Sequence, residues 1–270
     1  MSANDGGYTA LVRAIDVLSQ QPVRDIDELM SWSSPVLAFG DPTRCRVATL
    51  GINPSNREFT DTSGAELRPR SRRLQTLGSL GLDSWLDADA AHLESIITSY
   101  NRYFRLNPYD RWFRKLDVVV QGTNSSFYDS DSPACHLDLV PYATSTKWSR
   151  VPRDAQLTLL EASADTLGLL VRGSAVECLI LNGSSVIHAF RKVGNATLKE
   201  VERPEWTLSR ESSPDVRGKA YVGHTNRVGN VVLGRELRVL GFNHNLQSSF
   251  GVTAAAVNAI RSWIGSQFVT

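Results

Sequence analysis

The chain has 270 residues and a formal net charge of +1, with 41% hydrophobic and 21% charged residues. This composition is that of an ordinary globular protein, and it excludes long disorder and collagen-like or coiled-coil architectures. A charge near zero also argues against binding nucleic acid through bulk positive charge alone, although it leaves room for a local basic groove. The length suits one α/β domain as well as two small domains.

Neither the start of the chain nor any internal segment has the pattern of an export or membrane signal. The first eight residues are small and polar, without the basic start and apolar core of a signal peptide. No stretch approaches the roughly 18 consecutive apolar residues that a transmembrane helix needs. Cys45, Cys135 and Cys178 are odd in number and widely spaced, which favours buried thiols in a reducing compartment. We therefore expect a cytoplasmic protein without membrane segments.

Helical and strand patterns alternate along the chain. An acidic start with helical spacing over 10–18, and a further helical turn over 26–32, indicate a helical extension (1–40) packed on a single domain (41–270). Apolar runs predict strands over 47–52, 135–140, 176–181, 219–224 and 231–242. Amphipathic spacing predicts helices over 71–80, 88–104, 109–120, 154–171, 186–193 and 248–268. The polar segment 195–219 contains two prolines and predicts a loop or irregular hairpin.

The order of these elements predicts where a functional site would lie. Strands that alternate with helices imply an α/β fold with a mostly parallel sheet and helices on both faces. In such a sheet, ligands bind outside the carboxyl ends of the strands. Polar turns follow four of the predicted strands, at 53–55, 141–142, 182–184 and 243–245. We expect these turns to converge on one rim of the sheet.

Two of these turns resemble motifs of the uracil-DNA glycosylase superfamily. Residues 51–55 (Gly-Ile-Asn-Pro-Ser) are similar to the family's water-positioning loop, and closely resemble the Gly-Ile-Asn-Pro form of its mismatch-specific thymine/uracil branch. Residues 243–249 (Asn-His-Asn-Leu-Gln-Ser-Ser) resemble the family's loop that grips the extruded nucleotide and carries a wedge residue. The resemblance spans roughly residues 45–265. It implies a three-layer α/β/α sandwich and a reaction on DNA that needs neither a metal nor a cofactor.

The resemblance places catalysis in the two motifs. Such an enzyme extrudes a base from DNA and hydrolyses its N-glycosidic bond, which leaves an abasic site. Asn53 is then expected to hold the attacking water through its side-chain carbonyl, or it is only a turn residue ahead of Pro54. Because an amide cannot accept a full proton, stabilising the departing base must carry most of the rate. Asn243 or His244 would donate to that base, since His244-Asn245 replaces the family's Pro-Ser; His244 also fits a structural histidine.

Asp138 is the sharpest indication of the substrate. Many family members place a base-reading asparagine at its position, whereas an ionised aspartate only accepts hydrogen bonds, which suits the exocyclic amine of cytosine. This favours a modified cytosine over uracil, unless Asp138 caps a turn or pairs with an arginine. Phe59 resembles the aromatic side chain on which the flipped base stacks, with core packing as the alternative. Ile52, Pro54 and His136 complete the predicted base-binding site.

Small polar and basic side chains on the same rim are expected to contact the DNA backbone. Ser184 and Ser185 open a helix, where backbone amides form either a phosphate site or a plain N-cap. Leu246 resembles the wedge that fills the gap left by a flipped base, or it is buried under the last helix. The remaining predicted DNA-binding residues are Ser55, Arg57, Gln247 and Ser248. Further basic residues gather over 57–73, 147–153 and 227–261, beside the predicted rim.

Together these patterns predict a monomeric, monofunctional DNA glycosylase for modified cytosine, with a role in defence against phage that carry hypermodified DNA. One alternative is repair of uracil or thymine mismatches. Another is a non-catalytic nucleic-acid-binding module on the same fold. A small-molecule hydrolase is disfavoured, because the sequence has no GxSxG, P-loop or HExxH motif. The mechanism requires that Asn53, Asp138 and His244 share one pocket.

Overall fold

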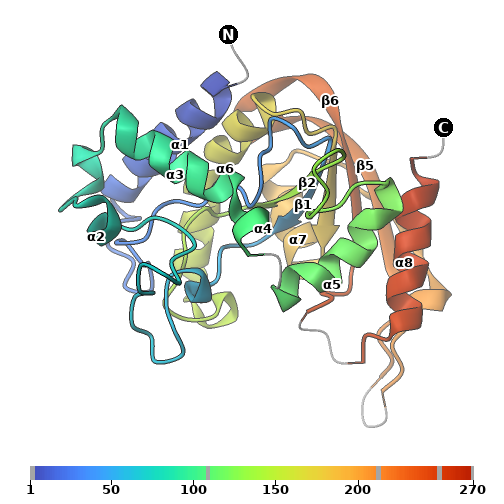
Figure 1. The fold of residues 1–270 in the computed structure, drawn as a ribbon. Coiled ribbons are helices and arrows are strands. Elements are labelled where there is room, and N and C mark those ends of the chain that lie inside the picture. The colour runs from blue at the N-terminus through green and yellow to red at the C-terminus, as the bar shows by residue number, and fades with distance from the viewer. Residues whose placement is uncertain (1–3, 108–109, 211–213, 248–250, 269–270) are drawn as a thin grey trace.

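The central element of the fold is a six-stranded sheet in the order β2-β1-β3-β6-β5-β4 (Figure 1). The computed structural model describes residues 4–107, 110–210, 214–247 and 251–268. Four strands run parallel: β1 (Val47–Gly51), β2 (Ala134–Asp138), β3 (Cys178–Asn182) and β6 (Val231–Phe242). At one edge, β5 (Lys219–Val228) pairs antiparallel with β6, and β4 (Lys199–Glu202) pairs antiparallel with β5. The prediction of an α/β fold with a mostly parallel sheet is confirmed.

Helices flank the strands. The first, α1 (Asn4–Ser19), packs on α6 (Arg153–Arg172), and α5 (Arg111–Val120) packs on α8 (Ala254–Ser266). In the view of Figure 1 the first pair lies to the left of the strands and the second to the right. The other helices are α2 (Leu77–Leu80), α3 (Ala90–Asn101), α4 (Tyr103–Leu106) and α7 (Ser184–Val193). Short 3-10 turns are η1 (Asn56–Glu58), η2 (Trp85–Asp87), η3 (Gln121–Thr123), η4 (Trp148–Arg150) and η5 (Pro204–Trp206). In the described ranges, no helix is long and apolar enough to cross a membrane.

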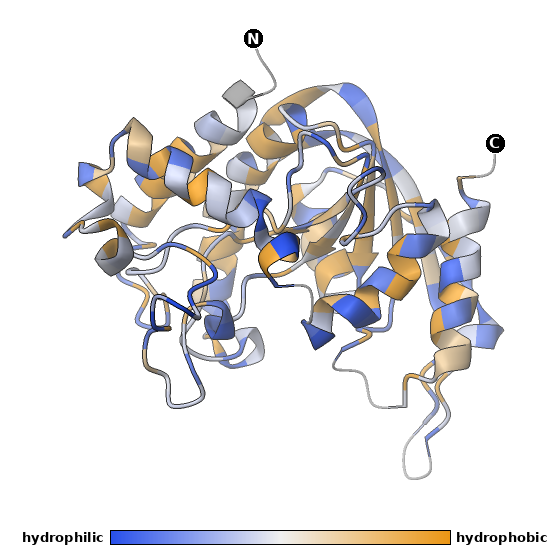
Figure 2. Cartoon of the chain, viewed as in Figure 1, coloured by the Kyte–Doolittle hydropathy of each residue, from blue (hydrophilic) through white to orange (hydrophobic). Residues whose placement is uncertain are grey.

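The parallel strands β1, β2 and β3 are buried along their whole length. Their apolar runs lack the alternation of a half-exposed strand, as expected where helices cover both faces of a parallel sheet. Figure 2 shows the apolar residues concentrated on these strands and on the helix faces turned toward them. Cys45, Cys135 and Cys178 lie in this core as free thiols, so their predicted burial is confirmed.

Two predicted helices are shorter than their sequence patterns suggested, because capping residues set their first turns. Over 71–80 only α2 is helical: Thr76 and Ser79 form a reciprocal capping box at its start, and Gly81 ends it with φ 70°. The last predicted helix, 248–268, begins only after Thr253, whose side chain accepts from the amide of Ala256.

Two other segments differ from expectation because they pair with distant parts of the chain. Residues 26–32 form no helix; the amide of Met30 donates to the carbonyl of Ala143 (3.0 Å), and Leu29 bridges to Thr144. The predicted loop 195–219 contains the edge strand β4 and the turn η5. In both segments the conformation depends on pairing with distant residues, which local sequence patterns do not indicate.

Candidate active site

A cavity of about 630 Å³ opens at the carboxyl ends of β1, β2 and β3. The turn after β1 lines it with residues 51–58, and the turn after β3 lines it with residues 182–186. The loop after β2 contributes residues 144 and 146–149, and the loop after β6 contributes Asn245. Ligand pockets have volumes of roughly 300–1,000 Å³, so this cavity has the size and the place expected for a binding site in an α/β sheet.

Asn53 lines the cavity with one end of its amide fixed. Its Nδ2 donates to the carbonyl of Tyr142 (3.2 Å) and to Thr144 Oγ1 (3.1 Å). Because the carbonyl of Tyr142 can only accept, these bonds establish which end of the amide is the nitrogen. They leave Oδ1 as the end that can accept from a ligand or a water. This is the orientation that a water-holding role requires.

Asp138 lies at the end of β2 as half of a buried pair. Its Oδ1 is 3.4 Å from His136 Nε2, and each of the two side chains is 3% exposed. The other ring nitrogen, His136 Nδ1, lies 2.7 Å from Thr49 Oγ1. Gly51, the register partner of Asp138, leaves the space that this pair occupies: a Cβ there would lie 2.9 Å from His136 Nε2 and still closer to Asp138 Oδ1. The absence of a side chain at this position therefore lets the imidazole–carboxylate pair line the cavity.

Aromatic rings form one wall of the cavity. Phe39, Trp112 and Phe113 surround His136, with centroid separations of 5.7, 5.2 and 5.3 Å. Trp112 is 38% exposed, in contrast to the buried Phe113. All three rings line the cavity, so it offers a flat apolar partner to a ring-shaped ligand. None of them was predicted as a site residue, because Phe39 precedes β1 and the other two belong to α5, outside the strand-end turns.

Phe59 does not belong to this wall. It is 1% exposed and packs edge-on against Trp32, with ring centroids 6.2 Å apart. Its ring belongs to the hydrophobic core and not to the cavity lining. The assignment of Phe59 as a stacking platform is therefore corrected: core packing, the alternative interpretation, describes it.

His244 lies outside the cavity lining. It is 1% exposed, and its Nε2 donates to the carbonyl of Trp206 (2.7 Å). Burial lowers the pKa of His244 from its usual 6.5, although the hydrogen bond to Trp206 acts in the opposite direction. Asn53 and Asp138 share one pocket, but His244 does not share it with them. The expectation that His244 donates to a leaving base is corrected, because its ring is committed to the protein interior.

Asn243 is also committed to structure. Its Nδ2 donates to the carbonyl of Arg217 (2.8 Å), and its Oδ1 accepts from the amide of Lys219 (2.8 Å). Both ends of the side chain thus fasten the turn after β6 to the start of β5. A catalytic role for Asn243 would require these bonds to break, so this prediction is corrected as well.

The predicted wedge is buried. Leu246 is 0% exposed, and its amide approaches Asn182 Oδ1 (3.4 Å). Gln247 connects two lining residues, since its Oε1 accepts from Asn182 Nδ2 (2.9 Å) and its Nε2 donates to the carbonyl of Trp112 (3.2 Å). Leu246 therefore fits the buried alternative and not a wedge that protrudes from the surface. Ser248 lies outside the described residues.

Ser184 and Ser185 open α7 at the edge of the cavity, and both are exposed. Gly183, with φ 100°, directs the chain into the helix. The amide and the hydroxyl of Ser184 both donate to the carbonyl of Asn243 (3.0 Å each). Ser184 therefore serves the turn after β6, whereas Ser185 remains the more available of the two for an anion at this helix start.

The basic residues divide into two groups. Exposed Arg57 and Lys147 line the cavity, as does the less exposed Arg73. In contrast, Arg235 donates to backbone carbonyls around the end of α6, and Arg238 donates to the carbonyl of Gln267. The expected basic cluster over 227–261 thus includes arginines that hold the fold together.

Ser55, another predicted DNA-binding residue, accepts from the amide of Arg57 (3.2 Å) and caps η1.

Glu58 is a buried carboxyl that the motifs did not indicate. It lines the cavity and is 7% exposed. Its Oε2 accepts from Tyr103 Oη (2.7 Å) and lies 3.4 Å from Arg73 Nη1. Burial raises the pKa of Glu58, while the hydrogen bond from Tyr103 and the charge of Arg73 oppose that shift. A buried carboxylate in a cavity is the kind of group that functional sites retain.

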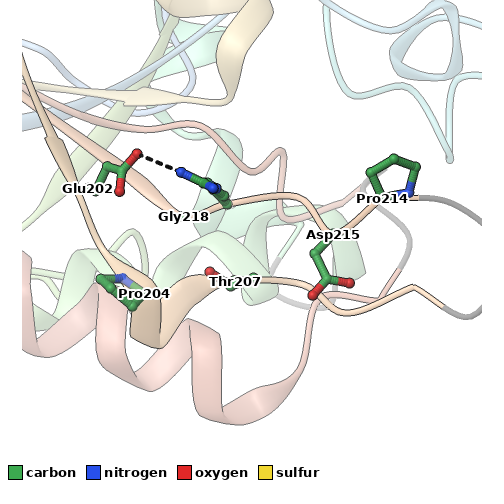
Figure 3. A pocket seen from close by; sticks show the side chains of 7 residues that line it. Glu202, Pro204, Thr207, Pro214, Asp215 and Gly218 are labelled. Carbon is green, nitrogen blue, oxygen red and sulfur yellow. Dashed lines mark hydrogen bonds and ion pairs between the residues drawn. The ribbon is translucent and has the colours of Figure 1, made fainter.

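A second hollow, of about 550 Å³, lies where the end of β4 approaches the start of β5 (Figure 3). Its ionisable side chains, Glu202, Asp215 and Arg217, are exposed, and Glu202 pairs with Arg217 at 3.3 Å. It has no aromatic wall. Over the part of the chain that the structure describes, no group of three or more His, Cys, Asp or Glu side chains could hold a metal ion. The cavity at the strand ends is therefore the better candidate for chemistry.

No protein-family model matches this sequence, and no curated protein matches it.

Proposed function

We propose that this protein is a monofunctional DNA glycosylase with the three-layer architecture of the uracil-DNA glycosylase superfamily, and that it excises a modified cytosine. One observation carries the proposal: Asn53 and Asp138 line the same aromatic-walled cavity at the strand ends. An acceptor for water and an acceptor for a base amine are the two polar groups that such a reaction needs from these positions.

In the proposed complex, the extruded base stacks against Trp112 and its exocyclic amine donates to Asp138. A water held by Asn53 Oδ1 attacks C1′ of the deoxyribose, and the bond to the base breaks. Since His244 lies outside the cavity lining, stabilisation of the departing base falls to other groups that line the cavity. Arg57 and Lys147, exposed at the cavity, contact the phosphates on either side.

The size of the cavity supports a modified base. A bare pyrimidine occupies only part of about 630 Å³. The space beyond it is bordered by polar side chains such as Thr146, Lys147 and Ser149, which suit a hydroxyl-bearing substituent. Bases of this kind occur in the hypermodified DNA of some phages, so we propose a role in defence against them. Excision of uracil or mismatched thymine is the second candidate.

The test is excision from defined duplexes. Purified protein is incubated with oligonucleotides that carry uracil, 5-hydroxymethylcytosine or glucosylated 5-hydroxymethylcytosine at one position, and strand scission after alkali reports abasic sites. We expect scission with a modified cytosine and its loss in Asn53→Ala with retained DNA binding. Scission with uracil alone supports the second candidate. DNA binding without any scission by the unmodified protein overturns the enzyme in favour of a binding module.

A further inference from the structure

The proposed hydrolysis needs a proton acceptor that neither sequence motif supplies. Attack of water on C1′ releases a proton, and the amide of Asn53 cannot take it. Three carboxyl residues line the cavity: Glu58, Asp110 and Asp138. Asp138 is assigned to the base. Asp110 caps α5, where its Oδ1 accepts from the amides of Trp112 (2.8 Å) and Phe113 (3.2 Å). Glu58 is the one left without an assignment.

The contacts of Glu58 leave one carboxylate oxygen for a reactant. Both Tyr103 and Arg73 approach Oε2, so Oε1 is the oxygen that remains to accept a proton. Glu58 ends η1, in the same cavity-lining loop as Asn53. A water held at Asn53 Oδ1 therefore lies in the cavity that Glu58 also borders. Tyr103 and Arg73 hold the carboxylate in place and keep its orientation fixed.

We propose that Glu58 is the general base of the reaction, an inference that rests on the glycosylase function proposed above. The water oxygen forms a bond to C1′, and one proton of that water passes to Glu58. The bond between C1′ and the base nitrogen breaks, and its electron pair leaves with the base. The base takes up a proton and Glu58 returns one to solvent, so the net change is the addition of one water.

The charged and titratable groups that face Glu58 determine the pH dependence of this step. They are Tyr103 from α4, Arg73 from the loop before α2, and Asp110 at the start of α5. Burial raises the pKa of the carboxyl, and Asp110 adds to that rise; Tyr103 and Arg73 lower it. Burial also raises the pKa of Tyr103, so its hydroxyl stays a donor over the working range. Since a base acts only when ionised, the rate falls as the pH drops through the raised pKa of Glu58.

The first test is Glu58→Gln, assayed by single-turnover formation of abasic sites between pH 5 and 9 on whichever of the three duplexes the unmodified protein cleaves. We expect a rate loss of roughly 10²–10⁴-fold, the usual contribution of a general base, and loss of the acid limb of the profile. Glu66→Gln is the matched control. Glu66 belongs to the same loop but bonds to Thr76 Oγ1 (2.6 Å) and does not line the cavity, so its profile stays that of the unmodified protein.

The second variant, Tyr103→Phe, separates catalysis from a structural role. The substitution removes the hydrogen bond from Tyr103 that favours the ionised carboxyl of Glu58, so the acid limb moves to higher pH. This result supports the inference even if Glu58→Gln folds poorly. If the unmodified protein forms abasic sites while both variants keep its rate and its pH profile, Glu58 is structural and the inference is overturned. If the unmodified protein forms none on any duplex, the proposed function itself fails, and the inference fails with it.

Discussion

The turn after β1 and the turn after β6 both carry an asparagine at a strand end, yet they use it in different ways. Asn53 lines the cavity and uses its amide nitrogen to bond Tyr142 and Thr144, which leaves its oxygen as the end able to accept from a ligand. In Asn243 both ends of the amide form hydrogen bonds with backbone groups, those of Arg217 and Lys219. From the sequence, both turns were expected to belong to one active site. The comparison shows that a polar atom without an internal partner, more than membership of a motif, marks the residue able to meet a substrate.

The largest expected effect on the reaction rate comes from replacing each of the two asparagines by alanine in a separate variant. Asn53→Ala should lower single-turnover abasic-site formation by roughly 10²–10³-fold, the usual cost of removing a preorganised polar group from an active site. Asn243→Ala should leave the rate per folded molecule nearly unchanged and reduce stability by about 1–3 kcal/mol, because two backbone groups lose their partner. Rates and urea unfolding of both variants provide the measurement. Equal rate losses in the two would remove the distinction between the turns.

The next effect concerns the choice of base. Asp138→Asn replaces an acceptor-only group with one that both donates and accepts, so preference should move from a cytosine-type base toward uracil by about 1–3 kcal/mol. Competition between two labelled duplexes measures that preference directly. Gly51→Ala provides a second approach: its Cβ would crowd His136 and Asp138, and excision of every base should fall together. An unchanged preference in Asp138→Asn would refute direct reading of the base by this side chain.

A smaller effect is expected at the aromatic wall. Trp112→Ala removes the exposed ring from the cavity and should weaken excision about tenfold, near the lower end of measured base–aromatic stacking. Phe59→Leu alters a core ring and should lower the melting temperature without changing the rate of the folded protein. Rates and thermal unfolding distinguish the two. A rate loss confined to Phe59→Leu would restore the stacking role predicted from the sequence.

The sequence predicted the elements whose signals are local. Long apolar runs without alternation identify β1, β2 and β3 because these strands are buried on both faces. The turn that holds Asn53 follows directly from the end of β1. Glu58 lies only a few residues further on. Its partner Tyr103 belongs to α4, and only the tertiary fold brings the two side chains together. Hydrophobic periodicity does not indicate which distant residues come into contact, so the sequence analysis did not identify Glu58 as a site residue.

The errors after β6 have a different origin. A short motif specifies an order of residue types, whereas the direction of each side chain depends on what packs against it. In the turn after β6, His244 bonds to the carbonyl of Trp206, and Asn243 bonds to backbone groups just before and at the start of β5. These partners lie in the segment 195–219, which was predicted as a loop or irregular hairpin and whose contacts could not be deduced from its composition. The last strand was located correctly while the roles of the residues after it were not.

His244 provides the smallest expected effect on chemistry and the clearest one on stability. Burial lowers its pKa below the usual 6.5, so the folded protein holds the ring neutral at a pH where the unfolded chain protonates it. The stability that this contributes is present above about 6.5 and is lost as the pH falls toward the lowered value. His244→Gln retains a donor for the carbonyl of Trp206 but does not titrate. Urea unfolding at pH 8 and pH 5.5 should therefore show a larger loss for the unmodified protein than for the variant. Abasic-site formation at pH 8 should change less than about threefold, which is well below the roughly 10² that a catalytic donor contributes. A large rate loss with unchanged stability would make the turn after β6 catalytic and reverse the contrast with the turn after β1.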